Sequence, residues 1–178
     1  MTTRIAFLRA VNVGARKVKM ARLLDLFGQL GYDDVWTHIN SGNVVFDATG
    51  SRAELERVIE STLERDLGFE CTTMVRTANE VRRALAEQPF TVAAADTYFI
   101  TFLKQVPSAV QRMALAALSN NFDTLVVRGR DVHWRMHGKS TDTKIPSRAW
   151  AKIVGDRRST SRNVTMLRAL IAKIGDRR

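Results

Sequence analysis

The sequence is poor in cysteine and in long apolar runs. Cys71 is the single cysteine among 178 residues, which excludes an internal disulfide framework and a cysteine-rich zinc module. Its apolar runs, such as 92–95, are too short to span a bilayer. Residues 1–4 also lack the charged and then apolar pattern of a secretory signal. We therefore expect a cytoplasmic protein that does not associate with membranes.

Recognised phosphate-binding, metal-binding and catalytic motifs are also missing. Neither G-x-x-x-x-G-K-[ST] nor G-x-G-x-x-G occurs, so the standard nucleotide-binding folds are not indicated. His133 and His137 have no cysteine or carboxylate at a metal-ligand spacing, and we predict that both lie on the surface. Ser41 follows His38 closely, but Ser-Gly suits a tight turn for backbone reasons alone, so a turn is favoured over a nucleophile pair. We expect no metal and no cofactor, and we assign no catalytic residue.

Basic residues, by contrast, are abundant and unevenly placed. The chain carries 28 Lys+Arg against 18 Asp+Glu, a net charge of +10. Residues 1–19 hold five basic and no acidic side chains, and residues 144–178 hold ten basic against two acidic ones. Residues 20–143 hold 13 basic against 16 acidic side chains, a net charge of −3. Basic ends that meet in space would create a field directed at anions, whereas separate ends would serve only solubility.

Hydrophobic periodicity and turn signals predict a β-α-β-β-α-β order followed by a helix in the first half. The expected elements are a strand at 4–10, a helix from 20 to 31, strands at 34–40 and 43–47, a helix at 51–67, a strand at 69–76 and a helix from 77 to 85. Capping boxes begin the last two helices, at Ser51–Glu54 and Thr77–Glu80. Residues 97–178 restart the order: a strand at 97–103, a helix at 108–118, strands at 124–128 and 131–136, and helices at 147–154 and 163–174.

The predicted fold class is therefore α+β, with two related ferredoxin-like (split βαβ) α/β subdomains packed together. The expected ranges are 1–90 for the first subdomain plus its helix and 97–178 for the second. The second is expected to be a βαββ variant with extra C-terminal helices. Paired carboxylates in the 51–67 helix, Glu56, Glu60 and Glu64, alternate with arginines and are predicted to lie on its solvent face.

The basic loop 12–19 is a candidate anion site. It leads directly into a helix, where unpaired backbone N–H groups and the helix dipole favour negative charge. Arg16, Lys17 and Lys19 add charge from their side chains. The alternative is an ordinary strand-to-helix connection whose lysines are solvated.

Three stretches of the sequence resemble those of one family. Residues 8–14 (Leu-Arg-Ala-Val-Asn-Val-Gly), 38–46 (His-Ile-Asn-Ser-Gly-Asn-Val-Val-Phe) and 160–163 (Thr-Ser-Arg-Asn) are similar, in the same order, to motifs of the bacterial domain-of-unknown-function 1697 family. The resemblance implies two related α/β subdomains and no established activity. Ala10, Asn40 and Val164 depart from the family pattern, where glycine, glutamine and tryptophan are usual.

The polar members of these motifs define a hypothetical ligand site. They are Arg9, Asn12, Asn40, Ser41, Asn43, Arg162 and Asn163, and the basic loop adds Arg16, Lys17 and Lys19. We expect these residues to converge on one cleft that binds a phosphate-bearing anion, with bidentate contacts from Arg9 and Arg162.

Two classes of function remain open for such a cleft. The preferred one is a non-catalytic binding module for nucleic acid or another phosphate-bearing polyanion. The alternative is an enzyme or sensor that acts on a small phosphorylated or nucleotide metabolite in the same cleft. A protein-interaction module whose charge serves only solubility is a third, lower-ranked reading. The sequence favours no particular oligomeric state.

Overall fold

The structure is a computed structural model that describes residues 1–9, 11, 17–39 and 42–177. The chain forms two compact units, Met1–Val81 and Arg82–Arg178. This division falls inside helix α3 (Ala78–Ala86), whereas the ranges expected from the sequence, 1–90 and 97–178, keep that helix with the first unit.

The first unit has the split βαβ topology that its pattern predicts. Its elements are β1 (Thr2–Leu8), α1 (Met20–Gln29), β2 (Asp33–Thr37), β3 (Asn43–Ala48), α2 (Arg52–Leu67) and β4 (Thr73–Thr77), followed by α3. The four strands form one antiparallel sheet in the order β2-β3-β1-β4. The first strand of the unit, β1, and its last strand, β4, are therefore neighbours, as the ferredoxin-like arrangement requires.

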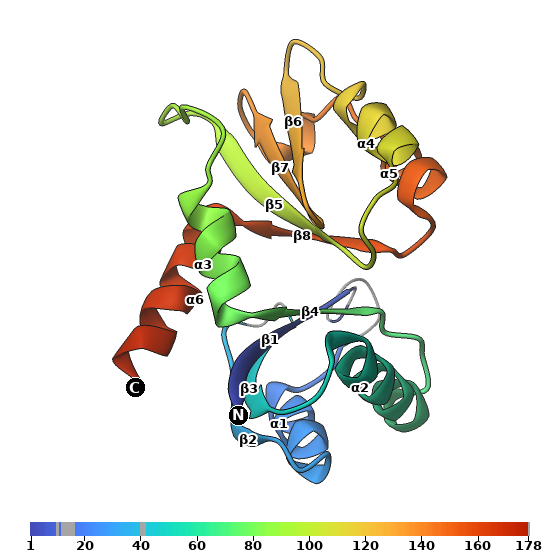
Figure 1. The fold of residues 1–178 in the computed structure, drawn as a ribbon, viewed down its shortest axis with the longest axis vertical. Coiled ribbons are helices and arrows are strands. Elements are labelled where there is room, and N and C mark those ends of the chain that lie inside the picture. Colours follow the sequence, from blue (N-terminus) through green and yellow to red (C-terminus); the bar gives the residue numbers. More distant parts are fainter. Residues whose placement is uncertain (10, 12–16, 40–41, 178) are drawn as a thin grey trace. The chain divides into compact units, whose positions relative to one another are not determined.

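Local signals explain where these helices begin and end. The Ser51 hydroxyl accepts a hydrogen bond from the Glu54 N–H at 3.2 Å, which starts α2. Gly68 ends the helix at φ 74°, a left-handed conformation that glycine adopts without steric cost. Helices α1 and α2 cover one face of the sheet (Figure 1). Their apolar sides pack there on alternate residues of the strands, such as Ala6, Leu8 and Phe46.

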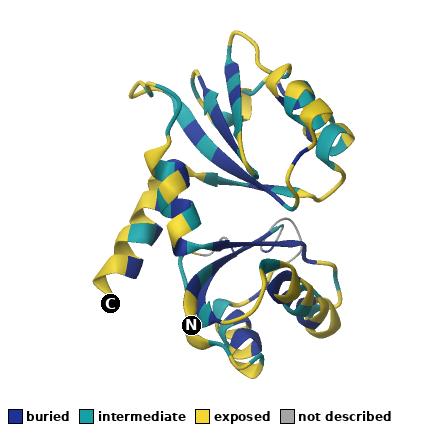
Figure 2. Ribbon diagram, viewed as in Figure 1, coloured by how far each residue is buried: buried dark blue, intermediate teal, exposed yellow. Residues whose placement is uncertain are grey.

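The second unit repeats the same topology with different residues. Its elements are β5 (Thr97–Leu103), α4 (Ala109–Ala116), β6 (Asp123–Arg128), β7 (Asp131–Met136), the single-turn helix η1 (Ser140–Asp142), α5 (Ser147–Val154), β8 (Ser159–Asn163) and α6 (Val164–Asp176). The antiparallel strand order is β6-β7-β5-β8. Helices α4 and α5 cover one face of this sheet (Figure 1). Buried residues recur along its strands (Figure 2). The core on that face contains Trp134 and Trp150.

Strand β8 is an element that the sequence analysis did not predict. It pairs with β5 from Leu103↔Ser159 to Phe99↔Asn163 and completes a full βαββαβ unit, where a βαββ variant was expected. Its sequence, Ser-Thr-Ser-Arg-Asn, contains no apolar side chain, so hydrophobic alternation gave no signal. The pairing comes instead from backbone hydrogen bonding to a central strand.

The register of the fourth strands shows that the two units correspond residue by residue. Arg76 in β4 lies opposite Ile5, and Arg162 in β8 lies opposite Ile100. Each arginine donates from Nη1 to the carbonyl of the residue before it, at 3.1 Å for Arg76 and 2.9 Å for Arg162. The two arginines thus occupy equivalent positions.

The next residue in each unit begins a helix. Thr77 Oγ1 accepts from the Glu80 N–H at 3.0 Å, and Glu80 Oε2 accepts from the Thr77 N–H at 2.7 Å, as the capping box predicts. Asn163 Oδ1 accepts from the Thr165 N–H at 2.8 Å and caps α6. Helices α3 and α6 therefore follow the two sheets in the same way.

Candidate anion-binding site

The end of β1 brings together two of the three motifs of the hypothetical site. The Leu8 N–H donates to the Gly42 carbonyl at 2.8 Å, and the Arg9 N–H donates to the Thr72 carbonyl at 2.9 Å. A Cβ on Gly42 would lie 3.1 Å from Leu8 Cβ and 3.2 Å from Leu8 O, and its φ is +71°. Only glycine allows this close approach in this conformation. The strand end that carries Arg9 is therefore fixed against the β2–β3 hairpin.

The basic loop is anchored at both ends by buried valines. Val11 and Val18 belong to the core beneath α1, while Lys17 and Lys19 on either side of Val18 are exposed. Lys19 is the N-cap residue of α1, and within the described residues its side chain makes no capping hydrogen bond. The first turn of α1 contains no acidic residue. The start of α1 thus combines the positive end of a helix dipole with two exposed lysines, and its own first turn supplies no carboxylate.

Asn43 holds the hairpin together from inside. Its side chain is fully buried and donates from Nδ2 to the His38 carbonyl at 3.1 Å. The His38 N–H donates in turn to the Asn43 carbonyl at 3.0 Å. Four other predicted site residues, Asn12, Arg16, Asn40 and Ser41, lie outside the described residues.

Arg162 and Asn163 lie in the second unit and have structural contacts there. Arg162 is half-buried, and its Nη1 donates to Thr160 Oγ1 at 2.7 Å. Asn163 is exposed, and its side-chain oxygen caps α6 by accepting from the Thr165 N–H. Val164, which departs from the tryptophan that the resemblance implies, is buried at the start of that helix. The convergence of these residues with the loop 9–19 on one cleft stays a prediction.

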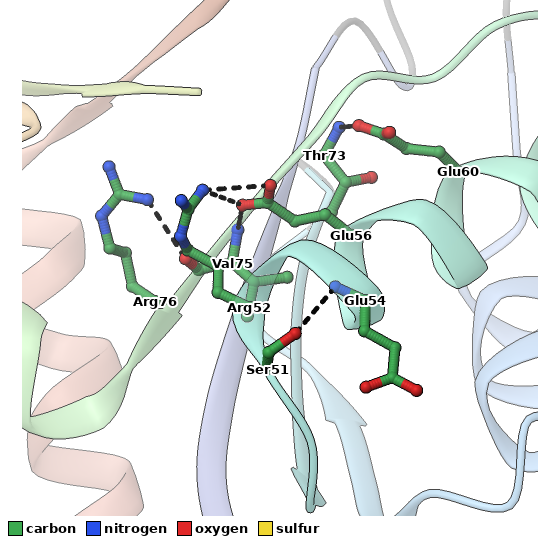
Figure 3. Close-up of polar contacts among 8 residues, drawn as sticks. All are labelled: Ser51, Arg52, Glu54, Glu56, Glu60, Thr73, Val75 and Arg76. Atoms are coloured by element: carbon green, nitrogen blue, oxygen red, sulfur yellow. Dashed lines mark hydrogen bonds and ion pairs between the residues drawn. The ribbon is translucent and has the colours of Figure 1, made fainter. Parts of the chain in front are cut away.

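Two of the three carboxylates predicted on the solvent face of α2, Glu56 and Glu60, instead point to β4, so the prediction was wrong for them (Figure 3). Glu64 is exposed, as predicted. Glu56 is 3% exposed and accepts from the Val75 N–H at 2.9 Å. Glu60 accepts from the Thr73 N–H at 2.8 Å. These N–H groups lie on the edge of β4 that faces away from β1. Side chains of α2 therefore accept hydrogen bonds from a sheet edge that no neighbouring strand covers. Arg52 pairs with Glu56 at 3.2 Å and balances its buried charge.

His133 is buried, which corrects its predicted surface position. The ring is fully enclosed, and Nδ1 is hydrogen-bonded to the Tyr98 hydroxyl. Burial, together with the charge of Arg128, lowers the pKa of His133 to about 4, and burial raises the pKa of Tyr98 to about 12. Nε2 is buried without a hydrogen-bond partner among the described residues. His137 is exposed, as predicted, and lies 3.1 Å from Asp96 Oδ1.

Asp123 is a buried carboxylate that organises the loop after β7. Trp134 Nε1 and Thr143 Oγ1 donate to its Oδ1 at 2.9 and 2.7 Å. The Lys144 N–H and Asn120 Nδ2 donate to its Oδ2 at 2.8 and 3.2 Å. Burial alone would raise the pKa of Asp123, but these hydrogen bonds stabilise the ionised form and the net pKa is lowered. No sequence motif indicates this role of Asp123.

No helix in the described ranges of the chain combines the length and the apolar character needed to cross a membrane. No group of three or more His, Cys, Asp and Glu side chains in the same ranges is placed to hold a metal ion.

Comparison with known proteins places these observations in context. A family model described as "Protein of unknown function (DUF1697)" matches residues 1–133. The structure of the conserved bacterial protein SP0830 from Streptococcus pneumoniae is similar, with 20% sequence identity, a TM-score of 0.70, and coverage of 98% of this chain and 99% of that chain. At that identity the likeness concerns the fold alone. No curated protein matches the sequence.

Proposed function

This chain belongs to the DUF1697 family of proteins of unknown function, and on that premise we propose that it is a non-catalytic anion-binding module. The ligand is nucleic acid or another phosphate-bearing polyanion. The proposed basic cleft contains Arg9, Asn12, Arg16, Lys17, Lys19, Asn40, Ser41, Arg162 and Asn163. The buried Asn43 supports it by holding the hairpin in place.

The observation that carries the proposal is the junction at the end of β1. The hydrogen bond from Leu8 to Gly42 holds the Arg9 segment against the hairpin, so two separate polar motifs share one end of the sheet. The outward lysines, Lys17 and Lys19, flank the start of α1. A phosphate at this end would meet cationic side chains and helix N–H groups together.

The charges suit a polyanion in particular. A net charge of +10 attracts anionic partners over a distance of about one Debye length, ~10 Å at moderate salt. Exposed lysines contact phosphates as point charges and need no fixed geometry. Binding of this kind is strong at low salt and weakens as counterions compete.

Fluorescence anisotropy with a labelled DNA duplex tests this function. We expect saturable binding at about 50 mM salt, with a log–log salt slope of about −0.9 for each phosphate neutralised. Arg9→Gln should weaken binding, while Lys139→Gln, an exposed charge of the second unit, should leave it close to wild type. Absent binding at low salt, binding that ignores salt, or equal losses in both variants would contradict the proposal.

The alternative function is an enzyme or sensor for a small phosphorylated or nucleotide metabolite in the same cleft. The start of α1, whose first turn contains no acidic residue, favours this reading, because a helix N-terminus accommodates a single phosphate without a long ligand. A metabolite that binds the native state should raise the melting temperature by mass action. Arg9→Ala or Arg162→Ala should abolish that rise, and a broad metabolite panel without any rise would remove this alternative.

A further inference from the structure

A cavity of about 130 Å³ lies at the end of β5 in the second unit. The loop between β5 and α4 forms one side of it, and the end of α5 with the segment before β8 forms the other. Its lining includes two cationic residues, Lys104 and Arg158, and four apolar ones, Leu103, Val106, Pro107 and Val154. The cavity therefore combines positive charge with apolar walls.

Hydrogen bonds fix the two sides of the cavity relative to each other. The Lys104 N–H donates to the Arg158 carbonyl at 2.9 Å. Gln111, which also lines the cavity, donates from Nε2 to the Ile153 carbonyl at 2.8 Å. The same side chain accepts from the Ser108 N–H through Oε1 at 2.9 Å, within the capping box of α4. The start of α4 and the end of α5 are thus joined by one amide side chain.

Gly155 positions the arginine of this cavity. Its φ is +91° and its ψ is 153°, a region that is essentially restricted to glycine. A Cβ at this position would lie 3.0 Å from Arg158 Cγ. The aliphatic part of Arg158 therefore lies directly over Gly155, and a side chain at position 155 would crowd it.

The cavity occupies the same topological place as the junction at the end of β1. In the first unit the Leu8 and Arg9 N–H groups donate to the residues that precede β3 and β4. In the second unit the Leu103 and Lys104 N–H groups do the same, to Arg130 at 2.9 Å and to Arg158 at 2.9 Å. Lys104 is thus the counterpart of Arg9, and a basic residue follows the first strand in both units.

We propose that this cavity is a second anion-binding site, which takes a single phosphate group at Lys104 and Arg158. Lysine and arginine are the residues that bind phosphate oxygens in proteins, the arginine through paired N–H donors. Sites for whole drug-sized ligands measure roughly 300–1,000 Å³, so about 130 Å³ suits one phosphate and a few attached atoms rather than a nucleotide. The apolar walls at Val106 and Val154 would contact those attached atoms. The proposal rests on the geometry of the second unit and not on the loop 9–19.

Nuclear magnetic resonance with inorganic phosphate as the probe tests the site in the full chain. We expect saturable shifts of the Val106 and Gly155 amide signals at phosphate concentrations up to about 20 mM, the range of weak binding. Arg158→Gln should weaken the binding about tenfold, since it removes a charged hydrogen-bond donor. Lys152→Gln removes the same charge from an exposed position of α5 outside the cavity, and it should leave the binding unchanged.

Two results would overturn the proposal. One is the absence of saturable shifts at these amides in wild type. The other is an equal loss in Arg158→Gln and Lys152→Gln, which would mean diffuse attraction by net charge. Arg9→Gln separates this site from the proposed cleft of the first unit: it should spare the Val106 and Gly155 shifts even where it abolishes DNA binding.

Discussion

Acidification should destabilise the protein through the buried side chain of His133. In the unfolded chain a histidine titrates near its ordinary pKa of 6.5, whereas the native ring does not accept a proton until the pH approaches 4. Between these values the unfolded state binds more protons than the native state, so the free energy of unfolding falls as the pH falls. The contribution of neutral His133 is complete above about pH 6.5 and is lost as the pH falls towards 4.

The size of the effect follows from the difference between the two pKa values. A difference of about 2.5 pKa units corresponds to about 3 kcal/mol, at 1.36 kcal/mol for each unit. The lowered pKa values of Asp96 and Asp123 act below their ordinary value of 3.8, so their loss falls outside this window. We therefore assign most of the core-specific change in the free energy of unfolding between pH 6.5 and 4 to the ring of His133.

Urea unfolding of wild type and His133→Gln at a series of pH values measures this contribution. The wild-type free energy of unfolding should fall by about 3 kcal/mol more than that of the variant between about pH 7 and 4. A ring titration of His133 by nuclear magnetic resonance gives the native pKa directly. Parallel pH profiles of the two proteins, or a native pKa near 6.5, would refute the reasoning.

Further substitutions test the other buried polar contacts, each by urea unfolding. Asp123→Ala leaves four donors without their shared acceptor and should cost about 3 kcal/mol or more. Glu56→Ala unpairs a buried backbone N–H of β4 and should cost about 2 kcal/mol, while Glu64→Ala on the exposed side of the same helix should cost almost nothing. Asn163→Ala removes the cap of α6 and should cost about 1 kcal/mol, most of which Asn163→Asp should retain.

Much of the fold could be predicted because its signals are local. The serine or threonine caps at Ser51, Thr77 and Ser108 mark helix starts within four residues, and each is found as a side-chain cap. The order of strands and helices then restricts the topology to few choices. Strand β8 could not be predicted in this way, because its pairing depends on a distant strand and not on its own polar sequence.

Buried polar residues were the main error of the sequence-based view. Glu56 and Glu60 alternate with arginines, a pattern typical of a solvated helix face. Their carboxylate oxygens instead accept hydrogen bonds from backbone N–H groups at the edge of β4. His133 alternates with core residues in β7, a pattern that predicts a solvent-exposed face, yet that face is enclosed at His133 and becomes exposed only at His137. Periodicity identifies which residues share a face but not whether a second layer covers it.

The two candidate sites differ in how far the sequence indicates them. Family motifs pointed to Arg9 and to the hairpin separately, and the register of β1 and β3 shows that they meet. The cavity at Lys104 gave no signal in the sequence, because its two sides are some fifty residues apart. Only the repeat of backbone hydrogen bonds at the ends of β1 and β5 relates the two places.

The salt dependence of DNA binding by a Lys17→Gln/Lys19→Gln double variant tests the anion-binding account most directly. Both lysines are exposed beside the start of α1, so their replacement leaves the core intact. If they contact phosphates, the slope of log affinity against log salt should become shallower by about 1.8, that is about 0.9 for each contact. A Lys139→Gln/Lys152→Gln variant should keep the wild-type slope. Equal slopes for wild type and the Lys17/Lys19 variant would contradict the account.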